Sequence, residues 1–160
     1  MENFVIWLKL NALVFYEMEN VQNLSAALPS HHVEALVKSW FAEDSPDFDI
    51  GGFIVGDKQE TAHLFIKSPG MLAGVPFFNA VFKELDCSVK WLYKEGSHIT
   101  PKPKEKIAFV QGPSCNILLG ERIALNCLAR ASGIATLTNK YSNLVETVGK
   151  NEKMIMLCIK

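Results

Sequence analysis

The sequence has little net charge and no regular cysteine pattern. Its formal charge is -1 at pH 7 and its isoelectric point is near 6.4, so nothing in the overall charge favours a nucleic acid or an acidic membrane as a partner. The four cysteines are Cys87, Cys115, Cys127 and Cys158. They contain no C-x-x-C pair, and three of the four fall among apolar neighbours in expected strands or helices. We therefore expect reduced thiols and a cytoplasmic protein that binds neither nucleic acid nor membrane.

Motifs of the common catalytic sites are also lacking. There is no G-x-S-x-G, no G-x-x-x-x-G-K-[ST], no G-x-G-x-x-G after a strand, and no Cys or His cluster with metal-ligand spacing. Glu43, Asp44 and Asp47 lie close together, but beside a proline where a helix is expected to end. A solvated acidic turn is favoured there over an acid/base pair, so the sequence predicts no self-contained active site.

The sequence has no apolar run long enough to span a bilayer. The strongest run, Phe4–Tyr16, contains Lys9 and Asn11, and Glu2 stands where a secretory signal would carry basic residues. We expect a core or interface segment there. Because Met18 opens a second Met-Glu-Asn triplet like the one at the N-terminus, translation starting at Met18 is a further hypothesis.

What remains is the composition of a globular domain with a substantial core, because 49% of the 160 residues are hydrophobic and 21% are charged. Apolar spacing predicts a helix with Ser30 as its N-cap that ends at Ser45-Pro46. A strand follows over 61–66 and turns at 68–70. One of its faces should be inward and the other should carry His63; the inward residues are Ala62, Leu64 and Ile66.

The middle of the chain continues this alternation. A helix beginning near Pro76 is followed by a strand over 88–94, a polar loop over 95–106 and a short strand over 107–112. Three residues of the helix are expected to be buried on one side: Phe77, Val81 and Leu85. Val89, Trp91 and Tyr93 should alternate along the first of these strands. The order of elements indicates a compact α+β domain.

The segment Leu118–Thr136 predicts a helix that is apolar almost all the way round. Its buried residues should be Leu118, Ile123, Ala124, Leu125, Cys127, Leu128, Ala131, Ile134 and Ala135. Only Arg122, Asn126 and Arg130 form a polar stripe, about 100° wide at the helical period. A sparser helix over 138–150 and an apolar, strand-like run over 154–160 follow.

Two interpretations of the arginine stripe stand side by side. In one, the arginines meet water and pair loosely with surface carboxylates, each pair contributing about 0–1 kcal/mol. In the other, the stripe binds an anion, since arginine suits bidentate recognition of carboxylate or phosphate. Ala129 and Gly133 on the same stripe would let another surface approach closely, and Gly120 indicates tight packing nearby.

Several longer segments resemble a known family. They are KSPGMLAGVPFFNAVFKEL, WLYKEGSHI and GPSCNILLGERIALNCLARASGIAT, with a first helix LPSHHVEALVKSWFAEDSP. In this order, from about Leu28 to Thr138, they resemble the N-terminal part of the quinolinate phosphoribosyltransferases, also called carboxylating nicotinate-nucleotide pyrophosphorylases. The implied fold is the N-terminal α/β sandwich domain of type II phosphoribosyltransferases, which in the family precedes an α/β barrel.

The resemblance also implies an activity. The family joins quinolinate to phosphoribosyl pyrophosphate with Mg²⁺, giving nicotinate mononucleotide, pyrophosphate and CO₂, in NAD biosynthesis and quinolinate catabolism. The enzymes are dimers or higher oligomers. By resemblance, Arg122 is the arginine that reaches the neighbouring subunit's site and holds a carboxylate of quinolinate; no ligand role is carried to Asn126 or Arg130, and no other site residue is assigned.

The chain departs from the family because the barrel, with its Thr-Arg-Lys-Thr segment and Mg²⁺ ligands, is largely absent. The expected organisation is an apolar extension over 1–27, the N-terminal domain with its active-site helix over 28–136, and a truncated barrel start or divergent tail over 137–160. A fragment, a splice form or a mispredicted product would look like this, and we expect the isolated chain to be inactive. Two alternatives remain: a non-catalytic form that associates with full-length subunits, and a plain scaffold domain.

Overall fold

The computed structural model describes residues 28–45 and 49–149. The chain divides into two compact units, residues 1–33 and 34–160. The apolar run Phe4–Tyr16, the second start at Met18, Asp47 and the apolar run 154–160 with Cys158 lie outside the described residues. In the first unit only residues 28–33 are described; they contain the start of a helix at Ser30, where the backbone N–H of His32 donates to the carbonyl of Pro29 at 3.0 Å.

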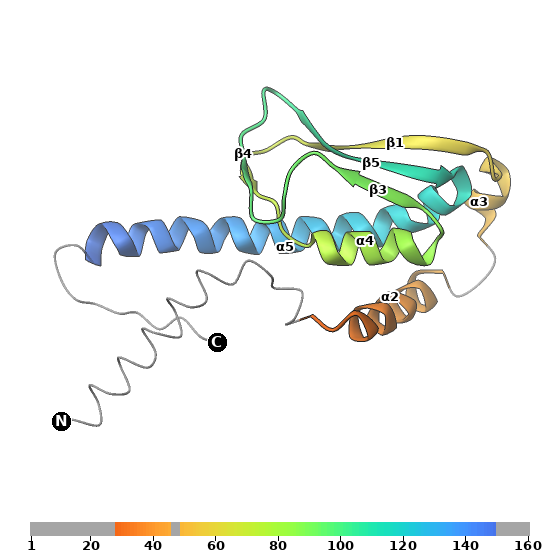
Figure 1. Cartoon of the computed structure of the whole chain (residues 1–160), viewed down its shortest axis with the longest axis horizontal. Helices are drawn as coiled ribbons and strands as arrows, with labels where there is room; N and C mark the ends of the chain where they lie inside the picture. The colour runs from red at the N-terminus through yellow and green to blue at the C-terminus, as the bar shows by residue number, and fades with distance from the viewer. Residues whose placement is uncertain (1–27, 46–48, 150–160) are drawn as a thin grey trace. The chain divides into compact units, whose positions relative to one another are not determined.

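Helices and strands alternate along the second unit. The bounds are α2 Ser30–Asp44, α3 Ile50–Val55, β1 Gln59–Ile66, β2 Gly70–Met71, α4 Val75–Glu84, β3 Ser88–Trp91, β4 His98–Ile99, β5 Glu105–Pro113 and α5 Ser114–Gly149. β1, β5 and β3 form an antiparallel sheet in that order, and β2 pairs with β4 in a second, two-stranded sheet. The architecture is α+β, with α4 and α5 on one side of the larger sheet (Figure 1).

The sheet has one inward and one outward face, as its alternation predicts. Ala62, Leu64 and Ile66 of β1 are half-buried and alternate with exposed residues, among them His63. Opposite them, β5 buries Ile107, Ala108 and Val110. The inward face of the strand over 61–66 is therefore confirmed.

α4 packs against both the sheet and α5. Val81 is buried as expected and Phe77 and Leu85 are half-buried, but α4 also buries Phe78 and Phe82, which the sequence analysis did not name. The buried arc is shifted because α4 has partners on two sides: the Phe78 ring lies 5.1 Å from that of Trp91 on β3, and Phe82 packs beneath α5. Sequence period alone does not show such a second partner.

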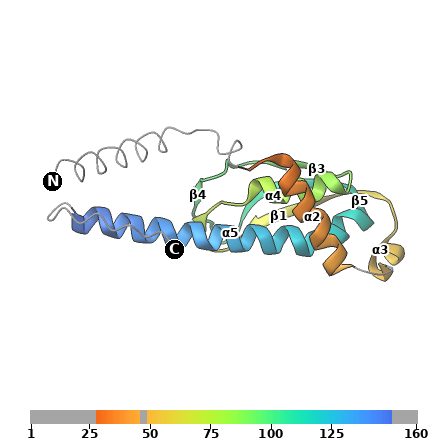
Figure 2. The same ribbon diagram turned by 90° about the horizontal axis from the view of Figure 1, so that it is seen from below.

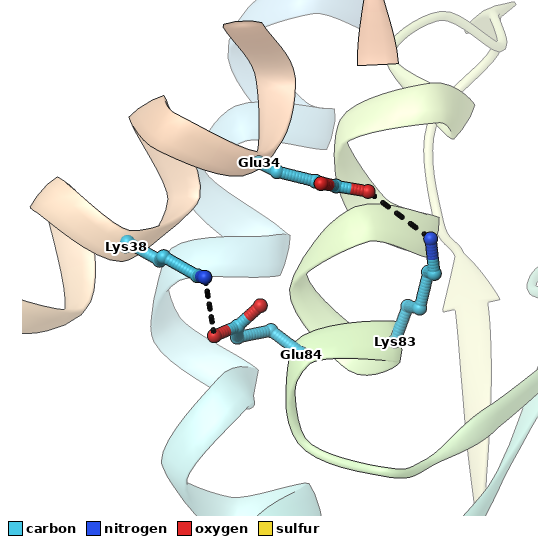
Figure 3. Close-up of polar contacts among 4 residues, drawn as sticks. All are labelled: Glu34, Lys38, Lys83 and Glu84. Atoms are coloured by element: carbon cyan, nitrogen blue, oxygen red, sulfur yellow. Dashed lines mark hydrogen bonds and ion pairs between the residues drawn. The ribbon is translucent and has the colours of Figure 1, made fainter. Parts of the chain in front are cut away.

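Two ion pairs join α2 to α4 (Figure 3). Lys83 Nζ lies 3.1 Å from Glu34 Oε1, and Lys38 Nζ lies 3.7 Å from Glu84 Oε1. The lysine of one pair comes from α4 and that of the other from α2, so each helix contributes one lysine and one glutamate to the two pairs. Since the two lysines are 65% and 76% exposed, each pair contributes only about 0–1 kcal/mol to stability.

α5 differs from its prediction in length and burial. One helix runs without interruption from Ser114 to Gly149, through residue 136, in place of two shorter helices. Buried along it are Gly120, Ile123, Ala124 and Leu128, but Leu118, Leu125 and Ile134 are exposed, so a nearly all-buried helix was wrong. The physical reason is that only one side of α5 meets α4 and the sheet, and its second half extends past the strands (Figures 1 and 2).

The short elements were not expected. α3 follows the acidic turn, β3 ends at Trp91 before Tyr93, and the polar loop over 95–106 contains β4. β4 is held by backbone pairing with β2, which lies far away in the sequence. None of the helices described between residues 28 and 149 has the combined length and apolarity needed to cross a bilayer.

Candidate binding residues on helix α5

Arg122 lies on an exposed part of α5, two turns from its start. Its side chain is 75% exposed, and Nη1 donates one hydrogen bond of 3.3 Å to Asp44 Oδ1 at the end of α2, whose side chain is 26% exposed. A guanidinium has five N–H donors in a planar fork, so this bond leaves most of them for a ligand. This contact agrees with the first interpretation, in which the arginines pair loosely with surface carboxylates. It does not conflict with the second, in which the stripe binds an anion.

The other members of the stripe share this exposure. Asn126 and Arg130 are exposed, as are Ala129 and Gly133 beside them. An added methyl group at Gly133 would meet nothing within 4 Å. The stripe predicted from the sequence is therefore a continuous open strip of α5, and the expected tight packing at Gly120 is also confirmed, since a methyl group there would lie 2.8 Å from Leu85 Cδ1.

The thiols of the described residues do not form an active centre. Cys87, Cys115 and Cys127 are free, and Cys87 is buried. Burial raises the pKa of the Cys127 thiol, and burial, followed by the nearby charge of Asp86, raises the pKa of the Cys87 thiol. Both thiols stay protonated near pH 7, which makes them poor nucleophiles.

No metal centre can be built from residues 28–45 and 49–149, because no three His, Cys, Asp or Glu side chains are grouped to hold an ion there. The acidic turn offers Asp44 to Arg122 instead. No described residue is assigned to the Mg²⁺ that the resemblance implies, and no chemical step is derived through it.

The outward face of the sheet carries a group of aromatic and cationic side chains that the sequence analysis missed. The rings of His63 and Phe109 lie 5.2 Å apart, Lys106 Nζ is 4.9 Å from the Phe109 ring centre, and Lys104 Nζ is 4.8 Å from that of Phe65. β1 and β5 bring them together through the register of His63 opposite Phe109. The only local signal was the shared outward position of His63 and Phe65 on β1; Lys104 precedes β5, so the strand pairing was needed to bring the group together.

A pocket of about 680 Å³ lies beside the arginine stripe, between the end of β1, the turn into β2 and the middle of α5. Leu125, Ala129 and Gly133 contribute the α5 side. Ala129 and Gly133, the small residues of the stripe, thus line this pocket. Its opposite wall comes from residues about 60 positions earlier, which no local pattern could connect to α5.

Comparisons of this chain with known families, sequences and structures all match it to the same group of proteins. Residues 47–132 match the family described as "Quinolinate phosphoribosyl transferase, N-terminal domain". The chain is 47% identical over 115 residues to the carboxylating nicotinate-nucleotide pyrophosphorylase of Rattus norvegicus, covering 72% of this chain and 38% of that protein. It is 40% identical over 136 residues to the Dictyostelium discoideum protein of the same name, covering 81% and 45%.

The fold agrees with these relatives. The structure of the nicotinate-nucleotide pyrophosphorylase from Francisella tularensis superposes with a TM-score of 0.70 at 31% identity, covering 75% of this chain and 43% of that one. The chain thus spans less than half the length of these relatives. It belongs to the quinolinate phosphoribosyltransferase family and has the fold of the family's N-terminal domain.

Proposed function

We propose that this chain supplies one part of a shared quinolinate phosphoribosyltransferase site. The reaction joins quinolinate and phosphoribosyl pyrophosphate to give nicotinate mononucleotide, pyrophosphate and CO₂, as in NAD biosynthesis and quinolinate catabolism. Family membership supports the reaction class. The observation that carries the role of this chain is the open Arg122 guanidinium, held by a single 3.3 Å bond.

Arg122 binds a carboxylate of quinolinate in this proposal. A carboxylate accepts two parallel N–H bonds from a guanidinium, and the planar fork fits it better than a lysine ammonium does. Asp44 holds the side chain beside α2 until the ligand carboxylate arrives. Because the pair with Asp44 is exposed, exchanging it for a ligand costs little, about 0–1 kcal/mol.

The remaining groups come from a second, barrel-containing subunit. In this proposal that subunit supplies the charges that bind the metal and the phosphates; among the described residues no three His, Cys, Asp or Glu side chains are grouped to hold an ion. We propose that the isolated chain is inactive, that it works in a homo-oligomer or with full-length subunits, and that it is cytoplasmic, as its free thiols favour.

The test combines this chain with the full-length rat relative carrying alanine at the position that aligns with Arg122. Quinolinate, phosphoribosyl pyrophosphate and Mg²⁺ are supplied, and nicotinate mononucleotide is followed by mass spectrometry. We expect turnover only when both chains are present. Arg122→Ala should lower it at least about 30-fold, the loss that corresponds to about 2 kcal/mol for hydrogen bonds to a charged group.

Two variants sharpen this result. Arg122→Lys keeps the charge but loses the fork, so it should restore little. Arg130→Ala removes an arginine from the same exposed strip and should leave turnover unchanged. Equal turnover with Arg122→Ala, or product from the 160-residue chain alone, would overturn the proposal.

A second candidate function is a non-catalytic partner that docks on full-length subunits and changes their rate. The exposed apolar residues in the second half of α5, Ile134, Leu137, Tyr141 and Leu144, favour it, because such a face needs a cover. Association with the full-length rat enzyme, with a rate change that Arg122→Ala does not abolish, would support this candidate over the first. A plain scaffold domain would show neither association nor a rate change.

A further inference from the structure

The pocket beside the arginine stripe has the size and walls of a small-molecule site. Its volume of about 680 Å³ lies within the range of about 300–1,000 Å³ that is usual for such sites. Leu64, Ile66 and Ile107 line it from the sheet, and Leu125 and Leu128 line it from α5. The wall is therefore mainly aliphatic.

Two hydroxyl groups in this wall, those of Ser132 and Thr136, are already used within the protein. Thr136 Oγ1 accepts the Met71 N–H at 2.8 Å and donates to the Ser132 carbonyl at 2.6 Å. Ser132 Oγ accepts the Ala73 N–H at 3.1 Å and donates to the Ala73 carbonyl at 3.0 Å. Neither of these two hydroxyls therefore needs a ligand as a partner.

The charged groups that line the pocket are all positive. Lys67, at the turn after β1, and Lys140, on α5, both line the pocket, and no Asp or Glu is among its lining residues. Both lysines are exposed, which places their ammonium groups toward the solvent side of an otherwise apolar hollow. The chain as a whole carries a net charge of -1, so this positive character is local.

We propose that this pocket binds an apolar monocarboxylate, a molecule with an aliphatic chain and one anionic end such as a medium-chain fatty acid. The chain lies along the aliphatic wall, and the carboxylate pairs with Lys67 and Lys140. This site is separate from Arg122 and needs no second subunit. A ligand without charge would leave the two ammonium groups unused, and a cationic one would be repelled.

The α5 side offers the space that such a chain needs. Ala129 and Gly133 line the pocket, and both are exposed. An added methyl group at Gly133 meets nothing within 4 Å, so the fold leaves room for a larger side chain there. Because Gly133 lines the pocket, we use Gly133→Leu as the variant that takes up pocket space.

The test is isothermal titration calorimetry of the 160-residue chain with decanoate, kept below its micelle concentration. We expect saturable one-to-one binding, and no saturable binding of decyltrimethylammonium, which has the same chain and the opposite charge. Gly133→Leu should weaken decanoate binding at least about tenfold by filling the space. Ala129→Leu is a second filling variant for the case that the first does not fold, which circular dichroism reports.

The lysines are tested separately. The double variant Lys67→Gln/Lys140→Gln should weaken decanoate binding by about fivefold, as for two exposed charge contacts. Lys90→Gln/Lys94→Gln removes two exposed lysines outside the pocket and should leave binding unchanged. The proposal is overturned if decanoate shows no saturable heat, if folded filling variants bind it as well as the parent chain, or if the ammonium amphiphile binds equally.

Discussion

At the scale of single residues, Tyr93 and Glu105 form a close polar contact outside the proposed sites. The Tyr93 hydroxyl donates to Glu105 Oε1 at 2.5 Å. This hydrogen bond, then burial and the negative charge of Glu105, raises the pKa of Tyr93 above its ordinary value near 10. In a protein carrying Tyr16→Phe and Tyr141→Phe, we expect the absorbance titration of the remaining tyrosine to have its midpoint above pH 10, and Glu105→Gln to move it down.

The direction of the pH effect on stability follows from the same shift. Because folding raises this pKa, the protonated phenol is favoured in the folded state. Its contribution to stability is fully present below pH 10 and is lost as the pH rises through the folded pKa. A midpoint that Glu105→Gln does not change would show that the hydrogen bond is not its cause.

At the scale of elements, a distant carboxylate caps the start of α4. Glu95 Oε1 accepts the Gly74 N–H at 2.8 Å, and Oε2 accepts the Val75 N–H at 2.9 Å. Helix N-termini leave such donors unpaired, and a negative charge there is favourable. Glu95→Ala should therefore lower the free energy of unfolding by about 1–2 kcal/mol, measured by urea denaturation.

Glu60→Ala is the matched control for this prediction. It removes an exposed carboxylate whose partner is Lys58, a neighbour two residues away on the surface. We expect a change below about 1 kcal/mol. Equal losses in the two variants would mean that the Glu95 carboxylate does not stabilise α4.

Gly120 and Gly133 of α5 offer a second test of packing. At Gly120 a methyl group would lie 2.9 Å from Cε1 of the buried Phe82 ring, whereas at Gly133 it would meet nothing. Gly120→Ala should destabilise the protein by about 1–3 kcal/mol through overpacking. Gly133→Ala should stabilise it by up to about 1 kcal/mol through helix propensity, and urea midpoints that place the two variants the other way round would contradict the contact.

These elements also show what the sequence could predict. The alternation of Ala62, Leu64 and Ile66 reports a local period, and the structure confirms that face of β1. β4 depends on pairing with β2, and the buried side of α4 depends on contact with both sheet and α5. Contacts between elements distant in the sequence leave no local pattern, which is why β4 was missed and why Phe78 and Phe82, the buried rings of α4, were not named.

The candidate site also has a part that the sequence predicts and a part that only the folded chain shows. The exposed stripe of Arg122 and Arg130 follows from helical spacing, so its position on α5 was predicted and is confirmed. Its link to Asp44, 78 residues earlier, and the far wall of the pocket required the folded chain. The carboxylate-binding role of Arg122 rests on resemblance and remains a prediction.

At the scale of the whole molecule, the second half of α5 presents an apolar face to solvent. Ile134, Leu137, Tyr141 and Leu144 are each 51–59% exposed, and their spacing of three and four residues places them on one side of the helix. An apolar face of this kind favours association with another surface. We therefore expect the purified chain to self-associate at concentrations of about 10–100 µM, as sedimentation velocity would show.

A charge placed on this face should prevent that association. Leu137→Glu puts a carboxylate among the four apolar side chains, where pairing would have to desolvate it, so the sedimentation coefficient should fall to that of the monomer. Ser142→Glu adds the same charge at an exposed position away from the centre of the face and should leave association unchanged. If Leu137→Glu sediments like the parent chain while both remain associated, another surface joins the subunits; if the parent chain is already monomeric at about 100 µM, the exposed face of α5 is too weak to pair with itself, and its cover must be a different protein.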